Sequence, residues 1–405
     1  MSRLVLKFGG TSVGDVDRIR NVAAKVKAVA DAGNEVAVVV SAMAGTTDQL
    51  VGLVRDIDPR GDLREYDVVV SAGEQISVGL LAIALQSLGC RARSWLGWQL
   101  PVRCDSAHGA ARILGIDADA VVTAMANGDI AVVPGFQGVS PDGRVTTLGR
   151  GGSDTSAVAL AAAVGADRCD IYTDVDGVYT CDPRIVTRAR KLDRITYEEM
   201  LEMASQGANV LQTRSVVMAL KHRVPIQVLS SFADVPGTLV VDEEDIVEDE
   251  TISGIAYAPG EAKITLVRVA DRPGVAASIF GPLANAGVNV DMIVQNVSED
   301  GKSTDVTFTV GRDDVARALK VIEGVRDEIE YERVQADPDV VKISVIGVGM
   351  RSHAGVAHTM FRALAEKGIN IQTITTSEIK ISVLIAEDYK ELALRTLHTA
   401  YGLDA

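Results

Sequence analysis

The stretch Lys7-Phe8-Gly9-Gly10-Thr11-Ser12-Val13, which directly follows the apolar, β-prone run 4–6, decides how the chain is organised. Glycines placed directly after a strand allow backbone N–H groups to point into a concavity that suits an anion such as a phosphate. Lys7 is the last charged residue before the turn, so its ammonium can reach whatever these amides bind. An ordinary surface turn is the alternative, because Gly-Gly pairs and single lysines are common at such positions.

A second glycine-rich loop, Gly149-Arg150-Gly151-Gly152-Ser153-Asp154-Thr155, precedes the alanine-rich run 156–164, which predicts a helix. Its last three residues are good N-caps, so the loop would leave helix N–H groups aimed at a ligand. Two glycine-rich anion sites, one with a lysine and one with an arginine and an aspartate, indicate a phosphoryl-transfer site. Together the two loops resemble those of the aspartokinases, within the amino-acid kinase family, and the resemblance spans essentially the whole chain.

Length, charge and cysteine usage limit the class of protein. At 405 residues the chain can form two or three domains with a large core, and its net charge of -15 argues against nucleic acid as a partner. We expect no membrane partner and no signal peptide, because no apolar run approaches about 20 residues and Lys7 interrupts the amino-terminal one. The four cysteines lack CxxC spacing, so we expect reduced thiols and a cytoplasmic protein.

Residues 1–238 alternate between strand-like and helix-like patterns. We expect strands at 36–40, 68–70, 130–133, 171–173 and 226–229, and helices at 15–32, 74–88, 197–205 and 211–222. Strands apolar on both faces, alternating with amphipathic helices, predict an α/β fold with a mostly parallel sheet sandwiched by helices. The resemblance implies that this is the amino-acid kinase catalytic domain. Ligands of such sheets bind at the carboxyl ends of the strands.

Two polar stretches, 41–48 and 71–74, follow the second and third expected strands. Taken alone, their hydroxyls and Glu74 could cap helices or complement a helix dipole, and Glu74 could equally bind a substrate ammonium. The resemblance implies that they contact the substrate. With the second loop, the implied substrate-binding residues are Ser41, Thr47, Glu74, Arg150, Gly151, Gly152 and Ser153.

The residues also indicate how phosphoryl transfer would proceed. A carboxylate acceptor is already ionised at pH 7, so no general base is required, but the repulsion between two anions must be offset. Lys7 is the candidate for the transferring phosphoryl group, with Mg²⁺ on the phosphates of ATP and no metal site of the protein itself. Arg150 can bind the α-carboxylate of aspartate in a bidentate pair, and Asp154 positions Lys7. The implied product is 4-phospho-L-aspartate, made in the first step of lysine, threonine and methionine biosynthesis.

The stretch 173–184 reads by itself as an ordinary loop and fits no EF-hand spacing. The resemblance implies that it wraps the nucleotide. The implied nucleotide-binding residues are Lys7, Phe8, Gly9, Gly10, Thr173, Asp174, Tyr179, Arg184 and Asn209. Asn209 departs from the pattern, because aspartokinases typically carry a lysine there, and Lys191 or Arg214 could substitute for it.

An internal repeat follows an acidic connector within 239–262. Gly274 and Gly355 are each followed by a second glycine after 13 residues and an asparagine after 15, which marks a duplicated module. The repeats resemble paired ACT domains, α+β ferredoxin-like modules that we place at 263–337 and 338–405. A duplicated dimerisation module without a ligand is the alternative.

The ACT resemblance implies that amino-acid effectors bind these modules, namely lysine, threonine or both, and that the chain forms a homodimer, or a higher oligomer, through them. The implied effector-binding residues are Asp271, Gly274, Asp291, Met292 and Gln295 in the first repeat and Asn370, Ile371, Thr376, Ser377 and Glu378 in the second. Two alternatives for the whole chain stay open. One is an amino-acid kinase with another acceptor, and the other is a catalytically weak amino-acid sensor, which Asn209 would favour.

Overall fold

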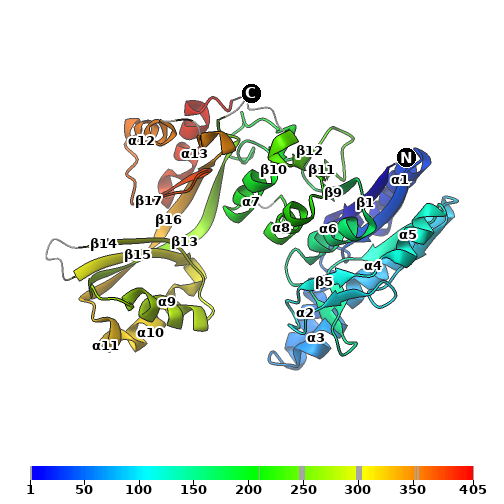
Figure 1. The fold of residues 1–405 in the computed structure, drawn as a ribbon, viewed down its shortest axis with the longest axis horizontal. Helices are drawn as coiled ribbons and strands as arrows, with labels where there is room; N and C mark the ends of the chain where they lie inside the picture. Colours follow the sequence, from blue (N-terminus) through cyan, green and yellow to red (C-terminus); the bar gives the residue numbers. More distant parts are fainter. Residues whose placement is uncertain are drawn as a thin grey trace. The chain divides into compact units, whose positions relative to one another are not determined.

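The structure, a computed structural model, describes residues 2–208, 210–245, 251–297, 303–351, 353 and 355–404 (Figure 1). The chain divides into two compact units. The first comprises Met1–Val178, Lys191–Ala204 and Asn209–Val247, and the second comprises Tyr179–Arg190, Ser205–Ala208 and Glu248–Ala405.

An eight-stranded sheet in the order β10-β12-β11-β9-β1-β2-β6-β3 forms the centre of the first unit. All neighbouring strands are parallel except the pair β11–β12. The strands are β1 (Arg3–Phe8), β2 (Glu35–Val40), β3 (Ala92–Ser94), β6 (Ile130–Pro134), β9 (Arg168–Thr173), β10 (Arg194–Thr196), β11 (Ile226–Ser230) and β12 (Thr238–Val241). This confirms the predicted mostly parallel α/β fold.

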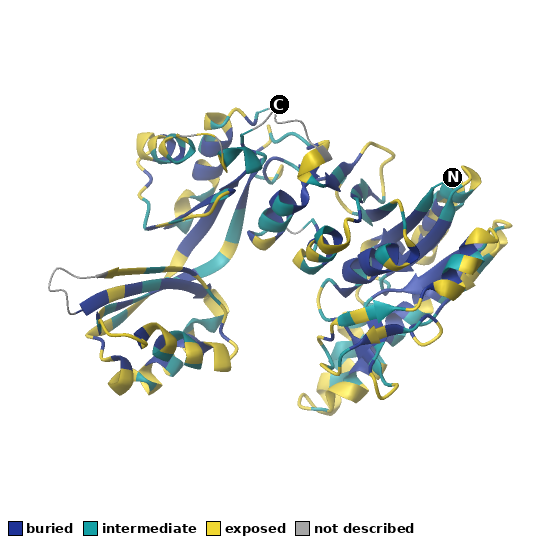
Figure 2. Cartoon of the chain, viewed as in Figure 1, coloured by how far each residue is buried: buried dark blue, intermediate teal, exposed yellow. Residues whose placement is uncertain are grey.

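Helices cover both faces of this sheet. The helices that begin in the first unit are α1 (Val16–Asp31), α2 (Thr46–Ile57), α3 (Leu63–Val70), α4 (Ala72–Ser87), α5 (Asp119–Ala126), α6 (Gly152–Val164), α7 (Tyr197–Ser205) and α8 (Thr213–His222). Alternate residues of β1 and β2 pack against α1 and α4, while α6 packs against β1, β2 and α8. Figure 2 shows the strands buried and the outer faces of the helices exposed.

The first helix shows how the sequence sets the helix boundaries. The Asp15 carboxylate accepts a hydrogen bond from the Arg18 N–H at 2.8 Å and so caps the amino terminus of α1. Gly33, with φ of 85°, follows the carboxyl terminus, where a left-handed residue is common. Both ends agree with the predicted helix at 15–32.

The expected strand at 68–70 is wrong, because these residues form the last turn of α3. A short apolar run does not distinguish a buried strand from one face of a helix, and here Asp67 and Val70 are buried while Val68 is exposed. The stretch 71–74 therefore joins two helices. Within the described residues, 63–87 is apolar and long enough by composition to cross a membrane, but half of its most apolar window is buried inside the protein.

A small second sheet, which the sequence did not predict, lies in the first unit. Its strand order is β5-β4-β7-β8. The strands are β4 (Val102–Cys104), β5 (Ile113–Ile116), β7 (Gln137–Val139) and β8 (Val145–Thr147). Because β8 ends directly before the loop 149–151, this sheet supports the second glycine-rich loop.

One six-stranded antiparallel sheet, in the order β14-β15-β13-β16-β18-β17, forms the second unit. Its strands are β13 (Gly254–Ala270), β14 (Val290–Val297), β15 (Ser303–Gly311), β16 (Arg333–Ile346), β17 (Thr373–Thr376) and β18 (Lys380–Ala386). The half with β14 and β15 carries α9 (Val275–Asn285), α10 (Val315–Gly324) and α11 (Arg326–Ile329). The half with β17 and β18 carries α12 (Val356–Glu366) and α13 (Lys390–Ala400). These halves are the two predicted α+β repeats.

The long strands β13 and β16 run through both repeats. Residues 254–258 pair with 342–346, so a segment that the sequence assigns to the connector contributes a strand to the second repeat. Of the acidic connector, Glu243–Asp245 form a short 3₁₀ helix, and residues 246–250 lie outside the described part of the chain.

The repeated glycines have a common conformational cause. Gly274 and Gly355 precede α9 and α12 with φ of 93° and 99°, while Gly287 and Gly368 follow these helices with φ of 68° and 69°. Such left-handed backbone strongly favours glycine, which explains why the 13-residue spacing is the same in both copies.

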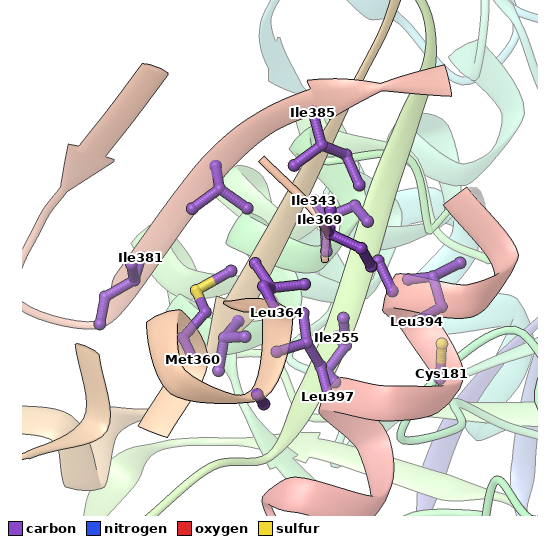
Figure 3. Close-up of a cluster of buried hydrophobic side chains, with 14 of the residues drawn as sticks. Cys181, Ile255, Ile343, Met360, Leu364, Ile369, Ile381, Ile385, Leu394 and Leu397 are labelled. Carbon is purple, nitrogen blue, oxygen red and sulfur yellow. The ribbon is translucent and has the colours of Figure 1, made fainter. Parts of the chain in front are cut away.

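Residues 179–190 belong to the second unit and pack into the core of its second repeat. Figure 3 shows Cys181 beside Leu394 and Leu397 in this cluster. The fully buried His398 lies with Nε2 2.9 Å from Thr180 Oγ1 and with Nδ1 2.8 Å from Asp404 Oδ1. The imidazole thus joins the segment 179–190 to the end of the chain.

Candidate active site

A cavity of about 950 Å³ opens in the first unit at the carboxyl ends of β1 and β2. The nine residues that the sequence predicts as catalytic or substrate-binding all line it. They are Lys7, Ser41, Thr47, Glu74, Arg150, Gly151, Gly152, Ser153 and Asp154. Sequence positions almost 150 residues apart therefore meet at one site.

Lys7 and Asp154 form an ion pair at the floor of the cavity. Lys7 Nζ lies 2.5 Å from Asp154 Oδ1, and each side chain is only about one tenth exposed. Lys7 extends from β1 on the face opposite to Leu6 and Phe8, which pack against α1 and α4. Asp154 lies in the first turn of α6, so the pair joins the first strand to the start of that helix.

The glycine turn after β1 lies close to this ammonium. A Cβ added to Gly9 would lie 3.5 Å from Lys7 Nζ, and one added to Gly10 would lie 2.9 Å from Ala42 O. Any side chain at Gly10 would therefore displace the loop that follows β2. The expected proximity of Lys7 to the glycine turn is observed.

The second loop differs in detail from its prediction. Gly151, with φ of 68°, is the N-cap of α6 and makes no side-chain capping bond, so residues 153–155 lie inside the first helical turn instead of capping it. Gly149 and Gly151 both have positive φ and flank Arg150. Arg150 is exposed to the cavity, and among the described residues no carboxylate lies within ion-pair distance of its guanidinium.

Glu74 is a buried carboxyl group in the cavity wall. It is 3 % exposed, and its Oε1 accepts a hydrogen bond from the Ala42 N–H at 3.1 Å. Its Oε2 is buried and has no hydrogen-bond partner among the described residues. Burial raises the pKa of Glu74 to about 7, against the weaker effect of backbone hydrogen bonds. A buried acceptor without a donor, at the edge of a cavity, is suited to a ligand ammonium.

Several further residues line the cavity that sequence reasoning missed, namely Asp48, Arg55, Tyr66, Phe136 and Gln212. Helical spacing could have indicated two of them. Asp48 and Arg55 recur at i and i+7 on α2, with Val51 and Gly52 between them on the same face. Gln212 packs closely over Gly151, since a Cβ there would lie 2.2 Å from Gln212 Cγ.

Only some of the residues predicted to bind the nucleotide line this cavity. Lys7 and Gly10 line it, whereas the Phe8 side chain is fully buried and stacks on Tyr172 with ring centroids 4.5 Å apart. Thr173 and Asp174, which share a 3.0 Å hydrogen bond, lie at the end of β9 in the first unit. Tyr179 and Arg184 belong to the second unit, where Arg184 pairs with Asp182 at 2.8 Å.

Asn209 lies outside the described residues. Of its two possible substitutes, Arg214 donates to the carbonyl oxygens of Leu148 and Ala111. Lys191 pairs with Asp176 at 3.3 Å and donates to Pro236 O at 2.5 Å. Both cations are therefore engaged in structural contacts.

The predicted effector residues lie in the second unit. Asp291 pairs with Lys342 Nζ at 2.5 Å, which lowers its pKa against the effect of burial, and Met292 is buried against Val340 and Leu384 with φ of 47°. The other candidates are exposed or half-buried: Asp271, Gly274, Gln295, Asn370, Ile371, Thr376, Ser377 and Glu378.

Comparison with known proteins defines the class first. The profile of the amino acid kinase family matches residues 2–230, and profiles of the ACT domain match residues 263–327 and 343–401. The chain therefore belongs to the amino acid kinase family and carries two ACT domains.

Named relatives narrow this class. Aspartate kinase Ask_LysC of Stutzerimonas stutzeri is 55 % identical over 406 residues, covering 100 % of this chain and 98 % of the relative. An aspartokinase of Mycolicibacterium smegmatis is 51 % identical over 408 residues, covering 100 % and 97 %. The crystal structure of E. coli aspartokinase III in complex with aspartate and ADP has a TM-score of 0.80 at 26 % identity, covering 98 % of this chain and 99 % of that one. The chain belongs to the aspartokinases, the kinases that phosphorylate aspartate.

Proposed function

We propose that the cavity binds aspartate between Arg150 and Glu74 and that Lys7 receives the terminal phosphate of ATP beside it. The observation that carries this proposal is the convergence of three groups on one cavity. These are a buried lysine paired with Asp154, an arginine without an ion-pair partner among the described residues, and a buried carboxyl oxygen without a donor among them.

Each end of the amino acid has a suitable group. The planar guanidinium of Arg150 binds the α-carboxylate through two parallel hydrogen bonds, and ionised Glu74 accepts from the α-ammonium. The neighbouring hydroxyls and amides of the two loops, at Ser41, Thr47, Gly151, Gly152 and Ser153, bind the remaining oxygens. The side-chain carboxylate is then free to face the phosphate.

Lys7 supplies charge where charge develops. The side-chain carboxylate attacks the γ-phosphorus, the bond to the β,γ-bridging oxygen breaks, and ADP leaves with 4-phospho-L-aspartate as the product. Positioning and neutralisation, not proton transfer, carry the acceleration. Asp154 holds the Lys7 ammonium at the floor of the cavity and keeps it from swinging into solvent.

ATP is the proposed nucleotide, which the ADP in the neighbouring aspartokinase III structure supports. Its contacts are those implied for Phe8, Gly9, Gly10 and the stretch 173–184, with Asn209 in place of the usual lysine. No cluster of three or more metal-ligating side chains occurs among the described residues. Mg²⁺ bound mainly through the phosphates of ATP and water would supply positive charge at the site of transfer.

The paired ACT domains are the proposed regulatory part. A second structure of E. coli aspartokinase III contains lysine and aspartate and is described as a T-state, with a TM-score of 0.78 and 27 % identity. We propose feedback inhibition by lysine, threonine or both at the effector residues named above. We also propose a homodimer through the ACT sheet, a cytoplasmic location, and a place at the first step of lysine, threonine and methionine biosynthesis.

The acceptor is tested by ADP release with aspartate, glutamate or N-acetylglutamate as the substrate, each with and without lysine and threonine. The proposal is supported if aspartate is the only one of the three acceptors that is turned over and if lysine, threonine or both reduce this turnover. Faster turnover with another acceptor contradicts the assignment of aspartate, and effector binding without turnover supports a sensor instead.

A further inference from the structure

Asp67, on the buried face of α3, belongs to none of the groups discussed above. Its side chain is fully buried, and it accepts hydrogen bonds from two other segments. Thr147 Oγ1 donates to Oδ1 at 2.5 Å, and the Gly109 N–H lies 3.1 Å from both carboxylate oxygens. His108 Nδ1 lies 2.8 Å from Oδ2.

These donors come from the segments that form one wall of the active-site cavity. Thr147 ends β8 two residues before Gly149, and Gly109, Gly149 and Arg150 line the cavity. The two segments touch, since a Cβ added to Gly149 would lie 3.3 Å from Gly109 O. The carboxylate of Asp67 is thus hydrogen-bonded to residues 108–109 and to Thr147, next to the part of the cavity wall that carries Arg150.

Because Asp67 is buried, moving either loop away from its carboxylate is energetically costly. Hydrogen bonds to a charged acceptor are roughly twice as strong as neutral ones, and a buried carboxylate that loses its donors keeps the full cost of its desolvation. The carboxylate is satisfied only when both loops are in place. A loop held in its binding conformation before the substrate arrives loses less conformational entropy on binding.

We propose that Asp67 is a positioning residue for the Arg150 loop. It fixes residues 147–150 against 108–109, so that the guanidinium meets the α-carboxylate of the amino-acid substrate without reordering the backbone. This inference rests on the proposed role of Arg150. The glycine turn after β1 makes none of these bonds, so loosening the wall affects the amino acid more than the nucleotide.

The first test substitutes Asp67→Asn in the full chain, which keeps the shape but removes the charge and one acceptor. We expect the KM for aspartate to rise about 10- to 100-fold and the KM for ATP to change less than about twofold. The matched control is Glu65→Gln, on the same helix. Glu65 pairs with Arg144 of the β7–β8 turn at 2.6 Å, but this pair is exposed, so both KM values should stay unchanged.

The donor side gives a second test that does not depend on how well Asp67→Asn folds. Thr147→Ser keeps the hydroxyl and should behave as the wild type, whereas Thr147→Val should raise the KM for aspartate. In an Asp67→Asn background Thr147→Val should add little, because both substitutions remove the same bond. Equal effects of the serine and valine variants would overturn the proposal.

Hydrogen exchange of the backbone amides at 147–152 separates this proposal from the one on which it rests. Exchange in the ligand-free chain should accelerate in Asp67→Asn and not in Glu65→Gln. Accelerated exchange, with the KM for aspartate unchanged both in this variant and in Arg150→Lys, supports the positioning by Asp67 and contradicts the role of Arg150. Unchanged exchange at 147–152, or equal rises in both KM values, overturns the positioning itself.

Discussion

The buried carboxyl of Glu74 predicts a pH step in the use of aspartate. Burial raises its pKa from 4.5 to about 7, which corresponds to about 3 kcal/mol between the two protonation states. The folded chain therefore retains the Glu74 proton between pH 4.5 and about 7, where the unfolded chain has lost it. Since the folded state binds more protons in this window, the stability of the ligand-free protein falls as the pH rises through it.

Only the ionised carboxylate can pair with the substrate ammonium, and at pH 6 about one tenth of Glu74 is ionised in the free protein. Measured at saturating ATP from pH 5.5 to 8.5, kcat/KM for aspartate should fall about tenfold per pH unit below about 7 and level off above it. Glu74→Gln should lower this value at pH 8 by about 10- to 100-fold, the loss expected for a hydrogen bond to a charged group, and should abolish the step.

The variant is also the control, because any step that comes from ionisation of the nucleotide persists when Glu74 is an amide. A wild-type profile that is flat between pH 6 and 8, or a step that persists unchanged in Glu74→Gln, would refute the assignment of Glu74 to the ammonium.

Three further substitutions test the substrate arginine, the glycine turn and the buried histidine. Arg150→Lys should raise the KM for aspartate about tenfold or more, because an ammonium cannot form the bidentate pair, and a rise confined to the KM for ATP would contradict this role. Gly10→Ala should lower kcat, because its Cβ would lie 2.9 Å from Ala42 O, whereas Gly79→Ala on α4, where a Cβ meets nothing within 4 Å, should leave kcat unchanged. His398→Leu should lower the free energy of unfolding by about 1–3 kcal/mol in a urea titration, since the buried Thr180 and the partly exposed Asp404 both lose a hydrogen bond, and an unchanged midpoint would argue against the joining role of the imidazole.

The features that the sequence predicted well are local ones. Gly149 and Gly151, on either side of Arg150, have left-handed backbone that glycine adopts easily. Gly10 has no room for a side chain beside Ala42 O, so in both loops the glycines themselves mark the feature. The ACT repeat was visible because its glycines recur at the same left-handed positions of two copies. Parallel strands then bring the carboxyl ends of β1 and β2 to one edge, so residues distant in sequence could be assigned to one site.

The features that sequence reasoning missed depend on distant contacts. The run 68–70 is too short for its periodicity to separate strand from helix, and the decision comes from what packs against it. Asp67 lies 80 residues from Thr147, and neither residue shows in its own neighbourhood that the two meet. The strand at 254–258 joins the second repeat only because β16 extends far enough to pair with it.

In the proposed reaction Lys7 neutralises a phosphoryl group while the side-chain carboxylate of aspartate attacks it. The most direct test is hydroxylamine trapping of the acyl phosphate by the wild type and by Lys7→Ala, with circular dichroism to show that both are folded. We expect the wild type to form aspartyl hydroxamate only when both ATP and aspartate are present, and Lys7→Ala to form about 100-fold less or lower still. Hydroxamate formed equally well without Lys7, or none formed from aspartate by the wild type, would contradict it.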